Sequence, residues 1–307
     1  MTRREFMLAA GSAALSGCLG PNERSAAAKV VKPEYHAFSR VFQFLKDPYR
    51  AAEFLKSCGY DGVEWTVRPG GFIEPEDAVR KLKAAKAAAD KAGLKADNIV
   101  VSFLRGDDPG AGAIAMAAAD AGFKSFRGAY FKYDRTKTTQ ANLDDFRRGF
   151  DTLDALARRS GLKACYQNHS TYNKSVPLFG SLVWDLYEIV RNYDPRSVGV
   201  QYDPMHVRAE GGPSWDHSFG AIAPWIDIVC LKDFYFILDP KTRKDWLREL
   251  VPAGKGIVDF REVKRMMALE GVAPRFTVHY DYDFPENEAG ARAFASSDVA
   301  WYRRQFG

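Results

Sequence analysis

The sequence is poor in the residues that build metal clusters and disulfide frameworks, since its 307 residues include only four cysteines and five histidines. Cys58, Cys165 and Cys230 have no zinc-knuckle spacing, and three is an odd number for disulfide pairing, so we interpret them mainly as core thiols. The chain also lacks a Lys/Arg block and any interleaving of aromatic with basic residues, and its formal charge of +5 is spread along the sequence. These absences argue against a nucleic-acid partner.

A glycine-rich phosphate loop is absent as well. The first apolar segment leads into "SRVFQFLKDP" (Ser39–Pro48), which contains no such loop. We therefore expect no nucleotide cofactor, and a doubly wound open sheet, which usually carries this loop after its first strand, becomes the weaker of two fold hypotheses. The hydrophobic content of 46% and the charged content of 27% are typical of a soluble globular protein, and the length allows a large core without disulfides.

The N-terminal segment, residues 1–33, is interpreted as a targeting segment and leader. Arg3–Arg4 precede a short apolar stretch, Met7–Leu15, in a pattern that resembles a twin-arginine export signal. The apolar stretch is too short to span a bilayer as a helix. The sequence "LSGC" (Leu15–Cys18) resembles a lipoprotein box, in which Cys18 would be lipidated after cleavage; the alternative is an ordinary cleavage region. We therefore expect an exported protein that is periplasmic or anchored to the membrane through Cys18, with a flexible leader over Pro21–Pro33.

Short apolar or β-branched runs alternate with helical stretches from about Glu34 to the C-terminus. Gly59 and Gly93 stand where the first two helices need C-caps. Eight strand–helix units in this length predict an α/β fold, a single (β/α)8 TIM barrel over residues 34–307. The predicted strands are Tyr35–Phe42, Gly62–Thr66, Asn98–Phe103, Ser125–Tyr130, Lys163–His169, Val198–Asp203, Asp227–Phe234 and Arg275–Tyr282. The predicted helices include Pro48–Cys58, Pro75–Ala92, Asn142–Arg159, Leu182–Tyr193 and Val258–Leu269.

Polar side chains recur at the late ends of these strands, where a barrel of this kind carries its active site. Because side chains alternate along a strand, one parity faces the barrel interior and the other faces the helices. The polar residues that share one parity within their strands, together with Arg127 at the end of the fourth, are Glu64, Cys165, Gln167, His169, Gln201, Asp203, Cys230, Lys232, Thr277, His279 and Asp281. Inward acids and bases on nearly every strand are costly for folding, so we predict that they share a functional site.

The stretch "SVGVQYDPMHVRAEGG" (Ser197–Gly212) has two interpretations. Asp203 and Pro204 form a dipeptide that commonly starts a turn. The alternative is that the strand delivers Asp203 to the site and the turn swings His206 back over it. The inward parity of Asp203 and the other polar strand ends favour the second interpretation.

Six short motifs, in this order, resemble the xylose isomerase-like TIM barrels, the group of sugar phosphate isomerases and epimerases, and within it an exported branch. They are "GYDGVEWT" (Gly59–Thr66), "YQNHS" (Tyr166–Ser170), "QYDPMH" (Gln201–His206), "LKDF" (Leu231–Phe234), "VPAGKGIVDF" (Val251–Phe260) and "VHYDYDF" (Val278–Phe284). The resemblance covers roughly Tyr35–Gln305. It implies a divalent metal held by a Glu ending strand five, the Asp of an Asp-x-x-His motif ending strand six, a His on strand seven and a Glu on strand eight.

Only part of this implied ligand set is present. Asp203 and His206 match the Asp-x-x-His motif, but Gln167 stands at the first Glu position, Cys230 at the His position and Asp281 at the second Glu position. The resemblance thus implies Asp203, Gln167 and Asp281 as ligands of Mn²⁺, Mg²⁺ or Zn²⁺, with Cys230 at a degenerate ligand position. A thiolate at that position would favour Zn²⁺ over the harder ions.

Sugar isomerases and epimerases move a proton on the carbon next to a carbonyl, which requires a polarising group and a base. The resemblance implies such an enzyme, and the expected export favours an unphosphorylated sugar as its small-molecule partner. The candidate catalytic residues are Glu64 or Asp281 as the base and Lys232 or His206 as the polarising group or proton donor. The candidate substrate-binding residues are Arg68, Arg127, His169 and His279. Without a metal, Lys232, His169 and Arg127 would have to supply the positive charge.

Three other functions are compatible with the same fold. A lyase or hydrolase acting on keto-glycosides by β-elimination would use the same residues and expel the glycosidic oxygen. The altered ligands also fit a barrel that binds sugar without catalysis. A DNA-repair endonuclease would need three metals built from many His and Glu residues, which five histidines, two of them (His36 and His217) outside the motifs, do not supply. No sequence feature specifies an oligomer.

Overall fold

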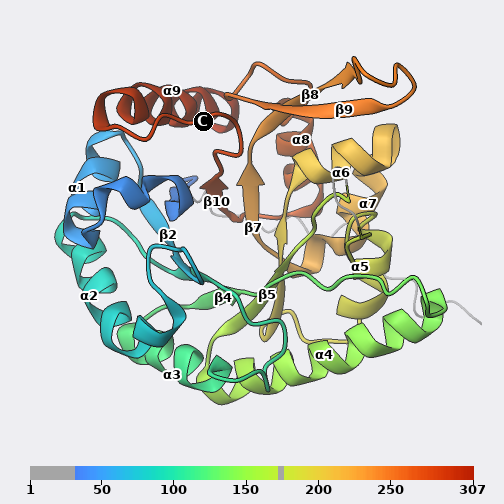
Figure 1. The fold of residues 1–307 in the computed structure, drawn as a ribbon, viewed down its shortest axis with the longest axis horizontal. Coiled ribbons are helices and arrows are strands. Elements are labelled where there is room, and N and C mark those ends of the chain that lie inside the picture. The colour runs from blue at the N-terminus through green and yellow to red at the C-terminus, as the bar shows by residue number, and fades with distance from the viewer. Residues whose placement is uncertain (1–31, 172–175) are drawn as a thin grey trace, which may run out of the picture. The chain divides into compact units, whose positions relative to one another are not determined.

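Eight parallel strands close into a barrel in the computed structural model, which describes residues 32–171 and 176–307 (Figure 1). Their order around the barrel is β1-β10-β7-β6-β5-β4-β3-β2, so the predicted (β/α)8 barrel is confirmed and the open sheet is wrong. The strands are β1 (Tyr35–Phe38), β2 (Gly62–Val67), β3 (Asn98–Val101), β4 (Ser125–Arg127), β5 (Lys163–Gln167), β6 (Val198–Tyr202), β7 (Ile226–Leu231) and β10 (Arg275–Val278). The expected export signal and the lipidation site Cys18 lie outside the described residues.

Helices surround the barrel and begin and end at the signals that the sequence carries. The Asp47 side chain accepts hydrogen bonds from the first backbone N–H groups of α1, and Pro48 occupies the first helical position, where no N–H is needed. Gly59 and Gly93, which follow α1 and α2, have φ values of 98° and 68°, a left-handed conformation that glycine adopts without strain. The helices are α1 (Pro48–Ser57), α2 (Ala78–Lys91), α3 (Ala111–Ala121), α4 (Thr139–Ser160), α5 (Trp184–Val190), α6 (Pro204–Gly211), α7 (Trp215–Ile222), α8 (Phe260–Glu270) and α9 (Glu288–Phe306).

The parity of the strand residues is as predicted. The strand side chains that were expected to face the helices are apolar or aromatic and almost completely buried, for example Trp65, Phe126, Tyr166, Tyr202 and Phe276. Among the described residues, none of the helices combines the length and apolarity that crossing a membrane requires.

Several predicted strands extend beyond the observed ones at their carboxyl ends. The first was expected to reach Phe42 but ends at Phe38, where a short 3-10 helix, Ser39–Leu45, begins. The fifth ends at Gln167 and the eighth at Val278, before the polar residues that follow them. Side-chain alternation continues in the extended chain after backbone pairing has ended, so the sequence pattern alone overestimates strand length. The late polar residues therefore stand on loops that leave the barrel.

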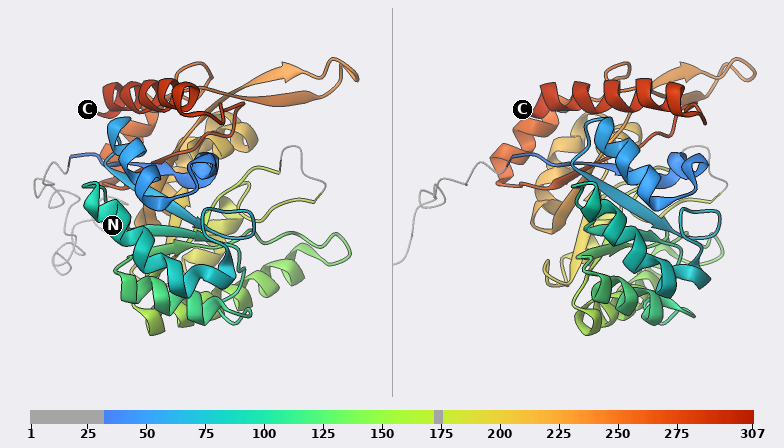
Figure 2. Two further views of the ribbon diagram at one scale, coloured as in Figure 1. Left: turned by 60° about the vertical axis from the view of Figure 1, so that its left-hand side comes forward. Right: turned by 90° about the vertical axis from the view of Figure 1, so that its left-hand side faces the viewer.

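The seventh predicted strand, Asp227–Phe234, is two elements. β7 ends at Leu231, Lys232 stands at the junction, and β8 (Asp233–Leu238) forms an antiparallel hairpin with β9 (Trp246–Val251). Figure 2 shows this hairpin projecting from the barrel. Lys232 and Asp233 interrupt the apolar run, which resumes at Phe234, and this interruption marks the point where one strand ends and the next begins.

Asp298 of α9 is a buried carboxyl group, 3% exposed, that holds the chain after the hairpin. It accepts hydrogen bonds from the Ala253 backbone N–H at 3.2 Å and from the Tyr282 hydroxyl at 2.8 Å. Burial, reinforced by the nearby Asp233 carboxylate, raises the pKa of Asp298 to about 6. Because the unfolded chain loses this proton near pH 4, the ionised carboxylate destabilises the fold increasingly as the pH rises from about 4 to about 7.

We therefore expect Asp298→Asn to be more stable than the wild type at about pH 8, by up to about 3 kcal/mol, and to lose this advantage near pH 4. The measurement is the free energy of urea unfolding of both proteins across this pH range. A difference between the two that does not change with pH would contradict the assignment.

Candidate functional site

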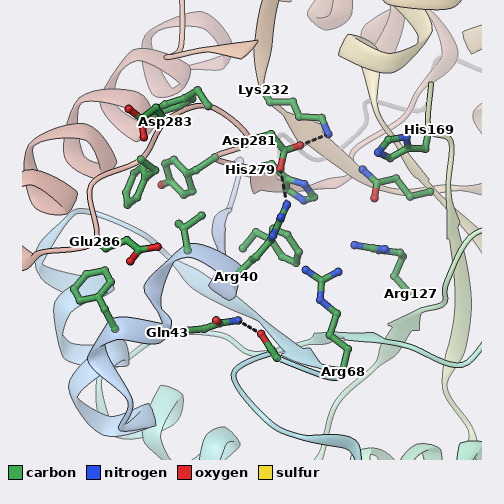
Figure 3. A pocket seen from close by; sticks show the side chains of 18 of the residues that line it. Arg40, Gln43, Arg68, Arg127, His169, Lys232, His279, Asp281, Asp283 and Glu286 are labelled. Atoms are coloured by element: carbon green, nitrogen blue, oxygen red, sulfur yellow. Dashed lines mark hydrogen bonds and ion pairs between the residues drawn. The ribbon is translucent and has the colours of Figure 1, made fainter. Parts of the chain in front are cut away.

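A cavity of about 1120 Å³ opens where the chain leaves the carboxyl ends of the barrel strands (Figure 3). Its walls include residues at, or directly after, the carboxyl ends of six of the eight barrel strands. The charged, polar and aromatic residues that line it include Phe38, Arg40, Arg68, Arg127, Tyr130, Gln167, His169, Lys232, His279 and Asp281. The structure thus brings together most of the predicted site residues. It leaves Glu64, Asp203, His206 and Cys230 behind the cavity wall.

Lys232 is the centre of the polar cluster. Its Nζ lies 3.0 Å from Oδ2 of Asp203, 2.8 Å from Oδ2 of Asp281 and 2.8 Å from Nε2 of His206. Burial by itself would lower the pKa of Lys232, but the two carboxylates outweigh burial and raise it. The side chain is therefore a buried ammonium ion at neutral pH.

Asp281 is the more accessible partner of this ammonium ion. Its side chain is 19% exposed, and its second oxygen, Oδ1, accepts a hydrogen bond from Arg40 at 3.4 Å. Burial opposes ionisation, but Lys232 and the other nearby cationic groups hold the pKa of Asp281 well below its usual range. Asp281 is consequently a carboxylate with little tendency to accept a proton.

Asp203 has both of the roles that the sequence left open. Its Oδ1 accepts a hydrogen bond from the His206 backbone N–H at 3.2 Å and so caps α6, which begins at Pro204. Its Oδ2 faces Lys232. The Asn168 side chain clamps its backbone, donating to the carbonyl oxygen at 3.0 Å and accepting from the N–H at 2.7 Å. The turn geometry thus fixes a fully buried carboxylate against the ammonium ion.

His206 is a buried imidazole with a cationic side chain at each ring nitrogen. Burial lowers the pKa of His206 well below its usual value, and the nearby basic side chains of His169 and Lys232 lower it further. Because the Lys232 ammonium can only donate, Nε2 of His206 accepts from it at 2.8 Å. Nδ1 lies 2.9 Å from Ser170 Oγ and 3.2 Å from Arg248 of the projecting hairpin, which also donates to the Ser170 hydroxyl oxygen.

His279 and Glu64 form a second pair in the barrel interior. Nε2 of His279 lies 3.5 Å from Oε2 of Glu64, which also accepts a hydrogen bond from Thr277 at 3.1 Å. Burial opposes ionisation of Glu64, but His279, Arg127 and Asn98 outweigh it and lower the pKa of Glu64. His279 lines the cavity and Glu64 does not, so the carboxylate orients the imidazole from behind.

His169 lies on the side of the Lys232 ammonium ion that faces away from Asp281 (Figure 3). The centroid of its ring is 3.8 Å from that of the His206 ring. Its Nδ1 is 2.9 Å from the Ser170 carbonyl oxygen, so Nδ1 carries the proton and Nε2 keeps its lone pair. Burial, together with the charge of Lys232, lowers the pKa of His169 to about 3. It is a neutral side chain and a weak base.

A chain of hydrogen bonds links Arg127 to the Lys232 cluster. Arg127 donates to the Tyr130 hydroxyl at 3.1 Å, and Tyr130 donates to Oε1 of Gln167 at 2.6 Å. The Gln167 amide then donates to Oδ2 of Asp203 at 2.8 Å. Gln167 therefore contributes an N–H to Asp203 in this network, and its oxygen is occupied by Tyr130.

The residues at the implied ligand positions do not fit a divalent metal. The carboxylates of Asp203 and Asp281 are both directed at the Lys232 ammonium ion, and Gln167 directs its amide N–H at the same Asp203 oxygen. Burial raises the pKa of the Cys230 thiol well above its usual value, so the thiol is neutral in this environment. Within residues 32–171 and 176–307, no group of three His, Cys, Asp or Glu side chains has the arrangement that a metal needs. The cation that contacts both carboxylates is the Lys232 ammonium ion.

Five further residues belong to this site but were not predicted. The Phe38 ring stacks on His279 at 4.3 Å, and Arg40, Asn168, Ser170 and Arg248 make the contacts described above. Phe38 and Asn168 have signals that could have been used, because each stands within one residue of the end of a strand. Arg248 lies far along the chain on an unpredicted hairpin, and no local signal marks it.

The polar strand ends around one cavity are typical of a (β/α)8 barrel enzyme. A model of the family described as xylose isomerase-like TIM barrel matches residues 52–303. The chain therefore belongs to this family, as the motifs predicted. A comparison of the sequence with curated proteins returned no match.

Solved structures with the same fold include sugar epimerases. The apo 3-keto-D-glucoside 4-epimerase from E. coli has a TM-score of 0.65 at 16% identity, over 89% of this chain and 100% of that chain. D-psicose 3-epimerase from Clostridium cellulolyticum H10, solved with D-tagatose, has a TM-score of 0.64 at 14% identity, over 89% and 99% of the two chains. A xylose isomerase-like TIM barrel protein from Mycobacterium smegmatis, solved in complex with magnesium, has a TM-score of 0.62 at 13% identity, over 89% and 98%.

Proposed function

We propose that the protein is a sugar isomerase or epimerase that moves a proton on the carbon next to a carbonyl. The observation that carries this proposal is the buried Lys232 ammonium ion at the wall of the cavity, with two imidazoles, His169 and His279, lining the same cavity. A cation beside the carbonyl oxygen and a base beside the neighbouring carbon are the two groups that the reaction needs. The names of two proteins with the same fold, a keto-glucoside epimerase and a psicose epimerase, support the same class of substrate.

Lys232 is the proposed polarising group. The substrate carbonyl oxygen would accept a hydrogen bond from Nζ in place of Asp281, whose carboxylate keeps its contact with Arg40. Asp203 and His206 remain on the far side of the ammonium ion and hold it in position. As the proton leaves the neighbouring carbon, the negative charge that develops on the oxygen is stabilised by an ion that is already in place.

His279 is the proposed base. Its Nε2–H faces Glu64, so Nδ1 carries the lone pair that can accept a proton, and the carboxylate behind stabilises the imidazolium ion that results. The alternatives are weaker: the pKa of His169 is about 3, and Asp281 is held ionised by Lys232. Glu64 thus acts through His279 and is a positioning residue in this proposal.

One intermediate can lead to two products, depending on which carbon receives the proton and from which face. The base removes the proton from the carbon next to the carbonyl, and an enediolate remains with its oxygen on Lys232. Delivery of a proton to the same carbon by a water molecule on the opposite face gives the epimer, and the proton on His279 then passes to the resulting hydroxide. Return of the proton to the former carbonyl carbon, with transfer of the hydroxyl proton between the oxygens, gives the isomer.

The experiment is deuterium exchange in D₂O, followed by NMR, with free ketoses and 3-keto-glucosides as substrates. We expect deuterium at the carbon next to the carbonyl, and His279→Gln should slow its incorporation by about a hundredfold or more. Release of the aglycone would instead establish β-elimination. Binding of a sugar without exchange or bond cleavage would establish a sugar-binding barrel, and both results contradict the proposal.

A further inference from the structure

Two arginines in the cavity have no carboxylate partner. No ion pair joins Arg68 or Arg127 to an acidic residue in the described part of the chain. Both guanidinium groups lie over the same aromatic ring, that of Phe38, at 5.6 Å and 5.9 Å from its centroid. Figure 3 shows both directed from neighbouring walls toward the middle of the cavity.

Arg127 is the more informative of the two because it is buried. The residue is 3% exposed, and its Nε–H has no hydrogen-bond partner. Its other contacts are to neutral oxygens, the Tyr130 hydroxyl at 3.1 Å and the Gly128 carbonyl at 3.4 Å. The ionised Glu64 is near enough for Arg127 to help lower its pKa, but the two form no ion pair. A buried guanidinium ion with no directly paired carboxylate is costly for folding, so its position calls for a ligand that supplies the negative charge.

Arg68 and Arg127 also repel each other. Burial lowers the pKa of Arg68, and the charge of Arg127, followed by that of Arg40, lowers it further. Arg40 itself is paired with Asp281. An anion placed between the two guanidinium groups would remove this repulsion and satisfy donors that now have no charged acceptor.

The opposite end of the barrel shows how the same fold treats cations that have only a structural role. Lys163 and Arg275, at the starts of β5 and β10, both contact the carboxylate of Asp227, at 2.7 Å in the case of Lys163. There the charges are balanced within the protein. Arg68 and Arg127, whose charges are not balanced in this way, line the cavity that a substrate can enter.

We propose that the substrate carries an oxyanion, a carboxylate or a phosphate group, which Arg68 and Arg127 bind while Lys232 holds the reacting carbonyl. This inference rests on the proposed sugar chemistry in the same cavity and narrows it from neutral sugars to acidic ones. The hydrogen-bonded chain through Tyr130 and Gln167 connects the anion-binding end to the reactive end. The cavity, at about 1120 Å³, is large enough for a sugar that reaches both.

The test is isothermal titration calorimetry with D-glucuronate, D-glucose 6-phosphate and D-glucose. We expect at least one of the acidic sugars to bind about tenfold to a hundredfold more tightly than D-glucose, and the preference to weaken as salt is added. Preference for glucuronate assigns a carboxylate, and preference for the phosphate ester assigns a phosphate. Arg68→Gln and Arg127→Gln should each reduce the preference to about threefold or less.

Arg148→Gln, on the exposed side of α4, is the matched control and should keep the preference. Arg68 is only half-buried, so its variant keeps the test valid if Arg127→Gln does not fold. Equal binding of acidic and neutral sugars, or a preference that survives in the Arg68 variant, overturns the inference. Calorimetry measures binding without turnover. A failure of deuterium exchange would therefore refute the proposed reaction, while the calorimetry would still test the anion-binding role of Arg68 and Arg127.

Discussion

Lys232→Ala is expected to reduce turnover by about a thousandfold or more, because it removes the ammonium ion that would stabilise the enediolate oxygen. The same substitution leaves the fully buried Asp203 carboxylate without its counter-ion. Leaving a buried charge unpaired costs about 3 kcal/mol of stability at neutral pH. The measurements are the rate of deuterium exchange and the free energy of urea unfolding, with Lys83→Ala, an exposed residue of α2, as the control that changes neither.

The Lys232→Ala variant also tests whether the lysine occupies the position of a metal. Without the ammonium ion, Asp203, Asp281 and His206 would face an empty space lined by two carboxylates and an imidazole. We expect Mn²⁺ to raise the melting temperature of the variant but not that of the wild type, and a chelator to leave wild-type activity unchanged. Stoichiometric metal in purified wild-type protein, lost together with activity on chelation, would show that the ammonium ion does not replace the metal.

Asp203→Asn is expected to reduce turnover by about a hundredfold or more while changing stability by no more than about 1–2 kcal/mol. Asparagine caps a helix nearly as well as aspartate, so the start of α6 is preserved. Lys232 keeps its contact with Asp281. What the substitution removes is the buried charge that holds the ammonium ion, and the loss of rate measures that role separately from the turn.

Asp194→Asn is the matched control for this prediction, because Asp194 also precedes a proline and accepts hydrogen bonds in an exposed turn away from the cavity. It should leave turnover unchanged. His206→Gln should lose rate without any change in metal content, as expected of a residue that positions Lys232. Unchanged turnover in both Asp203→Asn and His206→Gln would make the end of β6 a purely structural element and leave catalysis to Lys232, His279 and Asp281.

The sequence predicted the barrel and the set of inward residues because both depend on local periodicity. Alternation of side chains along a strand is a property of the backbone, so Gln167, Lys232 and Asp281 could be assigned to the interior without knowledge of their neighbours. The Asp203–Pro204 turn was visible for the same reason. The motifs that resemble the family are also short and contiguous, and the family was confirmed over residues 52–303.

Distances across the barrel were decided by the tertiary structure alone. Barrel closure and strand register place Lys232 of one strand end between Asp203 and Asp281 of two others, and they place Glu64 behind His279. A pattern along one strand carries no information on how far its side chains reach toward another. The sequence by itself therefore determined which residues face the interior, whereas the closed barrel decided that a lysine, bound between two carboxylates, stands where the family pattern implied a metal.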